Sequence, residues 1–233
     1  MNTFKAIFFL LFINSSWAAF GEQFCHLDDF YCIKVSAHDS WESLFDDPNQ
    51  IDLVQRINRI NINLSKDMIL AVPKNLDQLS IYDIAPFPRF IPATGEKNIY
   101  VDQKKLAWGA YNEEGELVWW GPVSAGTGNC SAEQGGCLTP TGTFRIIRKN
   151  DETCVSTVFP KRTNGQSGGA LMPYCMHFWR GYALHGSESV PGKPASHGCI
   201  RLFVQDARWL NEEFIELPGA GGKIGTKVTI TSG

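Results

Sequence analysis

The sequence predicts a mainly β protein, in which a β-sandwich or barrel-like domain follows a small α+β module. Three observations support this prediction. Short apolar runs separated by glycine-rich turns fill the chain from residue 97 onward, which is typical of antiparallel β structure. Residues 31–73 change from alternating to helical spacing and back to a strand, the pattern of a βααβ unit. A proline-rich stretch over 76–96 separates the two patterns and predicts a linker packed on the surface.

The composition fits a folded chain with two units. Of the 233 residues, 43% are hydrophobic and 19% are charged, which argues against a disordered protein and a coiled coil. Lys and Arg total 21 against 24 Asp and Glu, so the net charge is -3 and no basic surplus indicates nucleic-acid binding. We place the small module at 25–75, the linker at 76–96 and the larger domain at 97–231.

The N-terminus predicts export. Lys5 precedes an apolar run over 6–13, and Ser16 and Ala18 occupy the small-residue positions before a cleavage site. The run is shorter than the ~20 residues that cross a bilayer, so 1–18 is typical of a cleaved signal peptide, with an uncleaved anchor as the alternative. No second apolar stretch has membrane length. We therefore expect a protein of the periplasm or cell envelope without a membrane span.

Export affects the interpretation of the seven cysteines, because thiols in an oxidising compartment are usually paired. Six cysteines can pair in fifteen ways, and sequence alone does not choose among them. Proximity along the chain favours three pairs that each close a short loop: Cys25–Cys32, Cys130–Cys137 and Cys154–Cys175. Each such bridge stabilises by about 2–4 kcal/mol. Cys199 is then the unpaired, reactive thiol. A metal cluster is the competing interpretation, but the chain has no C-x-x-C pair, so we expect no metal site.

Local signals place the elements of the small module. A strand is predicted over 31–35, followed by a helix that Asp39 or Ser40 can cap. A second helix is predicted over 51–60 and a strand over 68–72, which a proline ends.

The larger domain is predicted to contain one helix, over 204–214, and six short strands. The strands are 99–101, 106–111, 117–124, 142–148, 183–185 and 227–231. Trp119, Trp120 and Trp179 are candidates for stacking on sugar rings, although aromatic residues in strands more often pack in a core.

The residues that carry chemistry lie between His185 and Cys199, where the sequence is HGSESVPGKPASHGC. Cysteine is a natural nucleophile because its thiolate forms at accessible pH, and a neighbouring imidazolium favours that form. Glycines lack a Cβ, so the backbone N–H groups around them can turn toward one point, as an oxyanion hole requires. The segment therefore predicts acyl transfer through a thioester.

The motifs PTGTFRI, MPYCMHF, GYALHG and ASHGCIRL resemble those of the L,D-transpeptidase catalytic domain of the YkuD type. The resemblance covers about residues 97–230. It implies that Cys199 attacks a carbonyl of a peptidoglycan stem peptide. It also implies that His185 is the general base, held in orientation by the backbone carbonyl of Gly186.

The same resemblance implies further roles in the site. The oxyanion would be bound by three backbone amides, those of His197, Gly198 and Cys199, with shaping of the turn as the alternative role of His197. Tyr174 resembles a residue that lines the acyl-donor site, and core packing is its alternative. Many members of the family have Asn where this chain has Arg201. Arg201 and Ser196 could each bind a substrate carboxylate, with a salt bridge or a turn hydrogen bond as the alternative.

The reaction that the resemblance implies takes an acyl group from a tetrapeptide stem and releases D-alanine. An amine acceptor gives a 3-3 cross-link or attachment to a protein, water gives L,D-carboxypeptidase activity, and a D-amino acid gives exchange. Carbapenem-type inhibitors are expected to acylate Cys199, and the chemistry requires no metal or organic cofactor. A non-catalytic peptidoglycan-binding protein is the alternative from another class, and a general cysteine protease is a weaker one.

The N-terminal segments KVSAHDSWESLF, INRIN and LSKDMILAVP resemble a LysM glycan-binding module. That family usually begins with a Gly-Asp-Thr turn, where this chain has Ala-His-Asp-Ser over 37–40. The resemblance implies that N-acetylglucosamine chains lie against the loops at 39–41 and 61–63. A packing module without its own ligand is the alternative.

Overall fold

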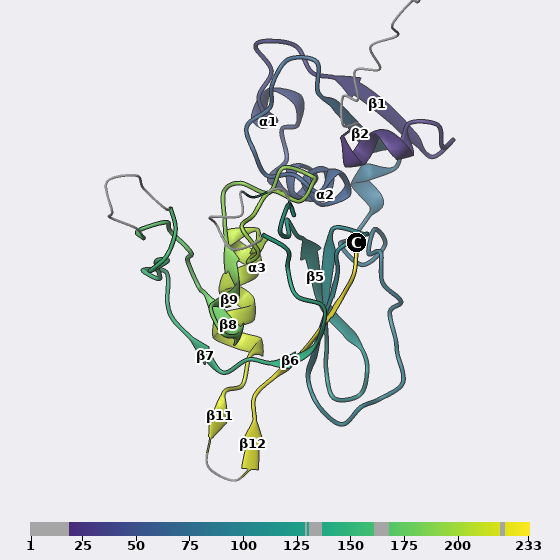
Figure 1. Cartoon of the computed structure of the whole chain (residues 1–233). Helices are drawn as coiled ribbons and strands as arrows, with labels where there is room; N and C mark the ends of the chain where they lie inside the picture. The colour runs from purple at the N-terminus through teal and green to yellow at the C-terminus, as the bar shows by residue number, and fades with distance from the viewer. Residues whose placement is uncertain (1–18, 129, 131–136, 161–167, 220–221) are drawn as a thin grey trace, which may run out of the picture.

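The structure is a computed structural model that describes residues 19–128, 130, 137–160, 168–219 and 222–233. Figure 1 shows a small N-terminal module and a larger, mainly β domain. The predicted signal peptide, 1–18, lies outside the described residues. Within the described part of the chain, no helix is long and apolar enough to cross a membrane.

Capping residues set where the helices of the N-terminal module begin and end. Its elements are η1 Phe20–Phe24, β1 Phe30–Lys34, α1 Trp41–Leu44, α2 Pro48–Asn58 and β2 Ile69–Pro73. Ser40 and Ser43 exchange side-chain and backbone hydrogen bonds in a capping box that begins α1. Asp47 caps α2 ahead of Pro48, and Arg59 ends α2 in the left-handed conformation. β1 and β2 pair antiparallel, so the elements follow in the predicted order.

The linker packs along the larger domain. After the short 3-10 helix η2 (Leu76–Gln78), the Tyr82 hydroxyl donates to the Val118 carbonyl at 2.9 Å. The Tyr111 hydroxyl donates to the Pro88 carbonyl at 2.7 Å. These contacts hold the segment against the surface of β4 and β5.

The larger domain is a sandwich of two sheets. Its elements are β3 Asn98–Asp102, β4 Ala107–Tyr111, β5 Leu117–Pro122, β6 Gly142–Arg145, β7 Arg148–Lys149, β8 Met176–Trp179, β9 Tyr182–Gly186, β10 Ile200–Leu202, α3 Val204–Trp209, the π-helix η4 Leu210–Phe214, β11 Pro218–Gly219, β12 Lys223–Ile224 and β13 Lys227–Thr231. One sheet has the order β5-β4-β3-β13-β6 and the other β10-β9-β8-β7. Trp108 from the first sheet and Met176 and Leu184 from the second are fully buried in one core between them. The predicted mainly β sandwich is thus confirmed.

The sheet β10-β9-β8-β7 has an apolar face and a polar face. β9 and β10 pair in parallel, with Leu184 opposite Ile200 and His185 opposite Arg201. β8 is antiparallel to β9, with Met176 opposite Leu184. Successive side chains on a strand point to opposite faces. The apolar members of these pairs therefore face the core, and His185 and Arg201 face away from it.

A buried ion pair joins the N-terminal module to the larger domain. Arg56 on α2, 1% exposed, donates to both carboxylate oxygens of Asp206 at 2.8 and 3.1 Å. Asp206, in the first turn of α3, is fully buried and also accepts from Trp119 Nε1 at 3.0 Å. Burial raises the pKa of Asp206, and the charge of Arg56 opposes that rise. Trp120 is fully buried beside Arg56, so it packs in this interface and is not a sugar-stacking residue.

A second contact joins the module to the segment between His185 and Cys199. Asn61 Nδ2 donates to the Ser187 carbonyl at 2.7 Å, and Asn61 Oδ1 accepts from the Val190 amide at 2.8 Å. The backbone amide of Asn61 donates to the Val190 carbonyl at 3.1 Å. Figure 1 shows α2 next to the larger domain on the side of α3 and β5.

Some elements differ from those predicted. The strand expected over 142–148 is divided into β6 and β7 because the chain changes partners: the Ile146 amide donates to Thr226, next to β13, whereas the Ile147 amide donates to His177 in β8. The short strands β8 and β10 were not predicted. The predicted helix is α3 continued by the π-helix η4.

We predict that Arg56→Met strongly destabilises the chain, because it leaves the Asp206 carboxylate buried without its cation, with only the Trp119 indole as a hydrogen-bond donor. Removing one member of a buried pair typically lowers the free energy of unfolding by about 3–5 kcal/mol. The measurement is urea unfolding followed by tryptophan fluorescence with the disulfides intact. The control is Arg208→Met, which removes an exposed pair with Glu212 and should change the free energy by about 0.5 kcal/mol or less. Equal effects of the two substitutions would contradict the prediction.

Candidate active site

A cavity of about 720 Å³ opens on the polar face of the sheet β10-β9-β8-β7. Its lining includes five of the predicted site residues, namely His185, Ser196, His197, Cys199 and Arg201. A loop over 153–159 contributes the opposite wall. The structure therefore gathers the predicted nucleophile, base and turn around one space.

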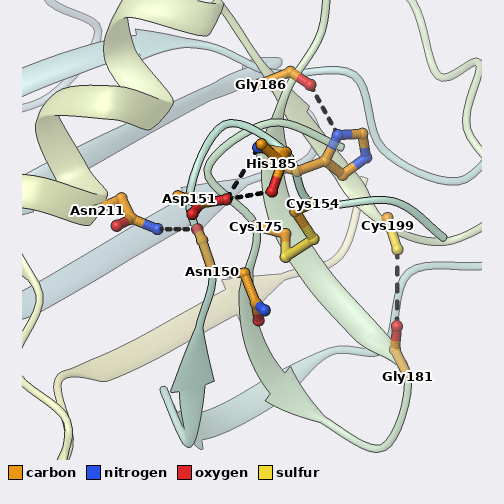
Figure 2. Close-up of a disulfide and its surroundings, with 10 residues drawn as sticks. Asn150, Asp151, Cys154, Cys175, Gly181, His185, Gly186, Cys199 and Asn211 are labelled. Atoms are coloured by element: carbon orange, nitrogen blue, oxygen red, sulfur yellow. Dashed lines mark hydrogen bonds between the residues drawn. A yellow bond between two sulfur atoms is a disulfide. The ribbon is translucent and has the colours of Figure 1, made fainter. Parts of the chain in front are cut away.

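Cys199 has the one free thiol among the seven cysteines, all of which are described. The other six form the three predicted disulfides, which are confirmed. The thiol lies 3.9 Å from the Gly181 carbonyl oxygen, and the residue packs against the cluster that holds the Cys154–Cys175 disulfide (Figure 2). Burial raises the pKa of the Cys199 thiol, so the thiol is neutral at pH 7.

His185 is held as a neutral base. Its Nδ1 lies 2.8 Å from the carbonyl oxygen of Gly186, the contact predicted for this residue (Figure 2). Because a carbonyl only accepts, Nδ1 must carry the proton, and Nε2 keeps its lone pair. Burial lowers the pKa of His185 to about 4, so the ring is uncharged at neutral pH. Gly186 is tightly surrounded, since a Cβ there would lie 3.1 Å from the Cα of Val204.

The turn from Ser196 to Cys199 is shaped by one hydroxyl. Ser196 Oγ accepts from the Gly198 amide at 3.0 Å and donates to the Cys199 carbonyl. The predicted oxyanion site included the Gly198 amide, but Ser196 already occupies that donor. Among the described residues, the amides of His197 and Cys199 have no acceptor. These two are the donors open to an oxyanion, and Ser196, 2% exposed, has its hydroxyl engaged within the turn.

Thr139, between the Cys130–Cys137 disulfide and β6, supports this turn. Thr139 Oγ1 donates to the Gly198 carbonyl at 2.7 Å and accepts from the Gly126 amide at 2.9 Å. Gly198 has φ +115°, and a Cβ on it would lie 2.6 Å from the Tyr182 ring, so only glycine fits here.

The His197 side chain points to that disulfide. Its ring stacks on Phe159 with centroids 4.8 Å apart. One of its ring nitrogens and the sulfurs of Cys130 and Cys137 lie within 4.8 Å of one another. Because the two sulfurs are joined in a disulfide, they lack the thiolate form that binds zinc.

Two predicted substrate-binding residues have different positions. Arg201 lines the cavity, donates to the Ser189 carbonyl at 3.2 Å, and its charge favours the thiolate of Cys199. Tyr174, in contrast, lies in the hydrophobic core at 9% exposure and does not line this cavity. It shares the core-facing side of the chain with Met176, two residues on. This position differs from the predicted place of Tyr174 in the acyl-donor site.

Two lining residues were missed by the sequence analysis, His177 on β8 and Arg148 on β7. They lie opposite each other in the strand pairing. A usable signal was present in MPYCMHF, because the apolar Met176 and Phe178 flank His177 and alternation turns it away from the core.

Alkylation should report the resting state of the thiol. We predict that iodoacetamide labels Cys199 alone and that the rate rises with pH to a midpoint above the ~8.5 of a free cysteine, because burial raises this pKa. Arg201→Gln should slow labelling several-fold at pH 8, since the arginine favours the thiolate. The control, Arg180→Gln, removes an exposed arginine that does not line the cavity. Mass mapping at a series of pH values provides the measurement, and a plateau already reached at pH 7 would contradict it.

Comparisons with known proteins agree with the fold of the larger domain. The sequence profile of the L,D-transpeptidase catalytic domain family (YkuD) matches residues 96–230. The putative L,D-transpeptidase YciB of Bacillus subtilis (strain 168) is 27% identical over 144 residues, which are 54% of this chain and 66% of that protein. This chain thus matches just under two thirds of that relative's length. The crystal structure of an L,D-transpeptidase from Xylanimonas cellulosilytica DSM 15894 has a similar fold, with a TM-score of 0.52, 24% identity and coverage of 78% and 79% of the two chains. The family profile matches more than half of the chain, and the chain belongs to the L,D-transpeptidase catalytic domain family.

Proposed function

We propose that this protein is a peptidoglycan L,D-transpeptidase with Cys199 as its nucleophile. The observation that carries the proposal is a single unbridged thiol that shares one cavity with a neutral imidazole whose Nε2 is free to accept a proton. The acyl donor is a tetrapeptide stem. Cys199 attacks the carbonyl between the L centre of its diaminopimelate residue and the terminal D-alanine.

Acylation begins with a proton transfer. Sγ of Cys199 gives its proton to Nε2 of His185, and its electron pair forms a bond to the carbonyl carbon. The oxygen becomes an oxyanion that accepts hydrogen bonds from the amides of His197 and Cys199. When the intermediate collapses, His185 gives the proton to the D-alanine nitrogen and the C–N bond breaks. The products are a thioester on Cys199 and free D-alanine.

Deacylation reverses these roles. An acceptor amine attacks the thioester, His185 takes the amine proton, and Cys199 leaves as a thiolate that His185 then reprotonates. An amine of a second stem gives a 3-3 cross-link, and a protein lysine gives attachment. With water as acceptor, the same site is an L,D-carboxypeptidase. A carbapenem-type β-lactam would acylate Cys199 by the first half of this sequence.

We place the reaction in the periplasm or cell envelope. The predicted signal, 1–18, would direct the chain there, and an oxidising compartment would form its three disulfides. The N-terminal module is proposed to lie near glycan strands. Two of its expected contact groups are engaged within the protein: Asn61 binds the larger domain, and the Trp41 indole donates to the Ile62 carbonyl at 3.0 Å. Its share in glycan binding is therefore limited to the exposed loop residues.

The test is release of D-alanine from a tetrapeptide muropeptide. The mature protein should release it and form a product mass with an amine acceptor, whereas Cys199→Ala should reduce the rate by about 10⁴-fold or more. Replacing His185 by alanine should reduce it by about 10²–10⁴-fold. D-alanine release without any cross-linked or exchanged product would identify the carboxypeptidase instead. Binding to peptidoglycan without release would identify the non-catalytic protein.

We predict that kcat/KM falls on the acid side only at low pH. Burial lowers the pKa of His185 to about 4, and protonation of Nε2 removes the base, so activity is lost as the pH falls through that value. We expect kcat/KM to be flat from about pH 5 to 7 and to fall tenfold per unit below about pH 4. Rates measured after brief exposure to each pH, with recovery checked at pH 7, separate titration from acid unfolding. An inflection near 6.5, where exposed imidazole titrates, would contradict the prediction.

A further inference from the structure

An unpartnered histidine lies on the polar face of the sheet, one strand away from the proposed base. His177 lines the cavity and is 7% exposed, and its Nδ1 is buried without a hydrogen-bond partner among the described residues. An orphaned buried N–H is rarer than an orphaned acceptor, which favours the tautomer with the proton on Nε2. Nε2 is not among the buried unpartnered atoms, and from there it can donate into the cavity. His177 is thus a neutral donor that the acyl-transfer steps do not use.

A cation lies beside this donor. Arg148 is directly opposite His177 in the antiparallel pairing of β7 with β8, and opposed residues of two strands project from the same face with their Cβ atoms about 5 Å apart. Arg148 is exposed and lines the cavity. Burial lowers the pKa of His177 to about 4, and the charge of Arg148 adds to that shift. Arg148 makes no ion pair with any residue in the described part of the chain.

The cavity as a whole favours anions. Its described lining includes Arg148 and Arg201 and neither an aspartate nor a glutamate. The two arginines lie on the edge strands β7 and β10 of the sheet, about 14 Å apart across the strands by three strand spacings and offset by two residues along them. Cys199 directly precedes β10, so Arg201 is near the nucleophile and Arg148 is at the far end of the cavity. A ligand that uses both cations must carry two separated negative groups.

The geometry points to a second carboxylate site, in which Arg148 and His177 bind the side-chain carboxylate of the donor residue that Cys199 attacks. This inference rests on the proposed function and extends it to the choice of donor. Such a donor has two free carboxylates near the reacting bond, one on the departing D-alanine and one at the end of the attacked residue's side chain. Arg201 is close enough to Cys199 for the first. The second carboxylate lies at the end of an extended ligand side chain, and the long side chain of Arg148 can reach toward it. A guanidinium binds a carboxylate with two hydrogen bonds.

The experiment compares two tetrapeptide donors that differ only in whether the side-chain carboxylate of diaminopimelate is free or amidated. Acylation is followed by intact mass and D-alanine release with no acceptor amine present, so that only donor recognition is measured. We expect the wild-type protein to be acylated about tenfold faster by the free carboxylate at subsaturating donor. Arg148→Gln should remove this preference by slowing the free donor alone. The matched control, Arg180→Gln, removes an exposed arginine in the β8–β9 turn outside the cavity and should keep the preference.

The outcomes separate this inference from the proposed function. Equal acylation of wild type by the two donors, or an equal loss for both in Arg148→Gln, overturns the carboxylate site and leaves the transpeptidase intact. A third donor, amidated at the D-alanine carboxylate, shows which of the two carboxylates Arg148 binds. If Arg148→Gln is acylated as fast as wild type by that donor, but more slowly by the donors with a free D-alanine carboxylate, Arg148 binds the departing D-alanine and the inference is wrong. Failure of all three donors to acylate the wild-type protein overturns the proposed function together with the inference.

Discussion

The parallel pairing of β9 with β10 is the constraint on which the site depends. Parallel neighbours cannot be joined by a tight turn, so the chain must leave the sheet after His185 and cross back, before Cys199, to the end of the sheet at which β9 begins. The return brings the thiol to the face that carries the imidazole, because His185 pairs with Arg201, two residues beyond Cys199. The glycine and proline residues of the crossover, and the hydroxyl of Ser196 in its last turn, allow the close approach that this path requires.

The N-terminal module binds that crossover and the helix that follows β10. Asn61 fixes the crossover just after β9 through the Ser187 carbonyl and the Val190 amide. Arg56 fixes α3, which follows directly after β10, through Asp206. Ordering a loop carries an entropic penalty for each residue that is fixed, and contacts at both ends of the crossover offset part of it. The loop that would contact a glycan in a LysM-like module is here partly engaged in hydrogen bonds to the crossover.

Local features were predictable from sequence, and long-range pairings were not. The disulfides followed from proximity, since each closes a short loop, and the Ser40 cap and the Ile230 strand followed from local pattern. The pair Arg56–Asp206 joins residues 150 positions apart, so no spacing rule indicates it. Tyr174 was assigned to the acyl-donor site only by resemblance, with core packing as its alternative, and the structure buries it in the core. Alternation in MPYCMHF indicates the face of His177, but not the cavity on that face, because residues far apart in the sequence line it.

The opposite pKa shifts of nucleophile and base explain how a free thiol persists next to a disulfide. Thiol–disulfide exchange requires the thiolate, and Cys199 packs against the cluster that contains the Cys154–Cys175 bridge. Burial raises the pKa of the thiol and lowers that of His185 to about 4, so the resting pair is neutral and exchange is suppressed. In the proposed reaction, a bound carbonyl would change this balance, because the developing oxyanion would gain hydrogen bonds from the amides of His197 and Cys199 at the moment that the imidazole becomes positive. In that step the negative charge would appear on the substrate oxygen, where the two amides stabilise it. The thiol would therefore react only when a substrate carbonyl is bound.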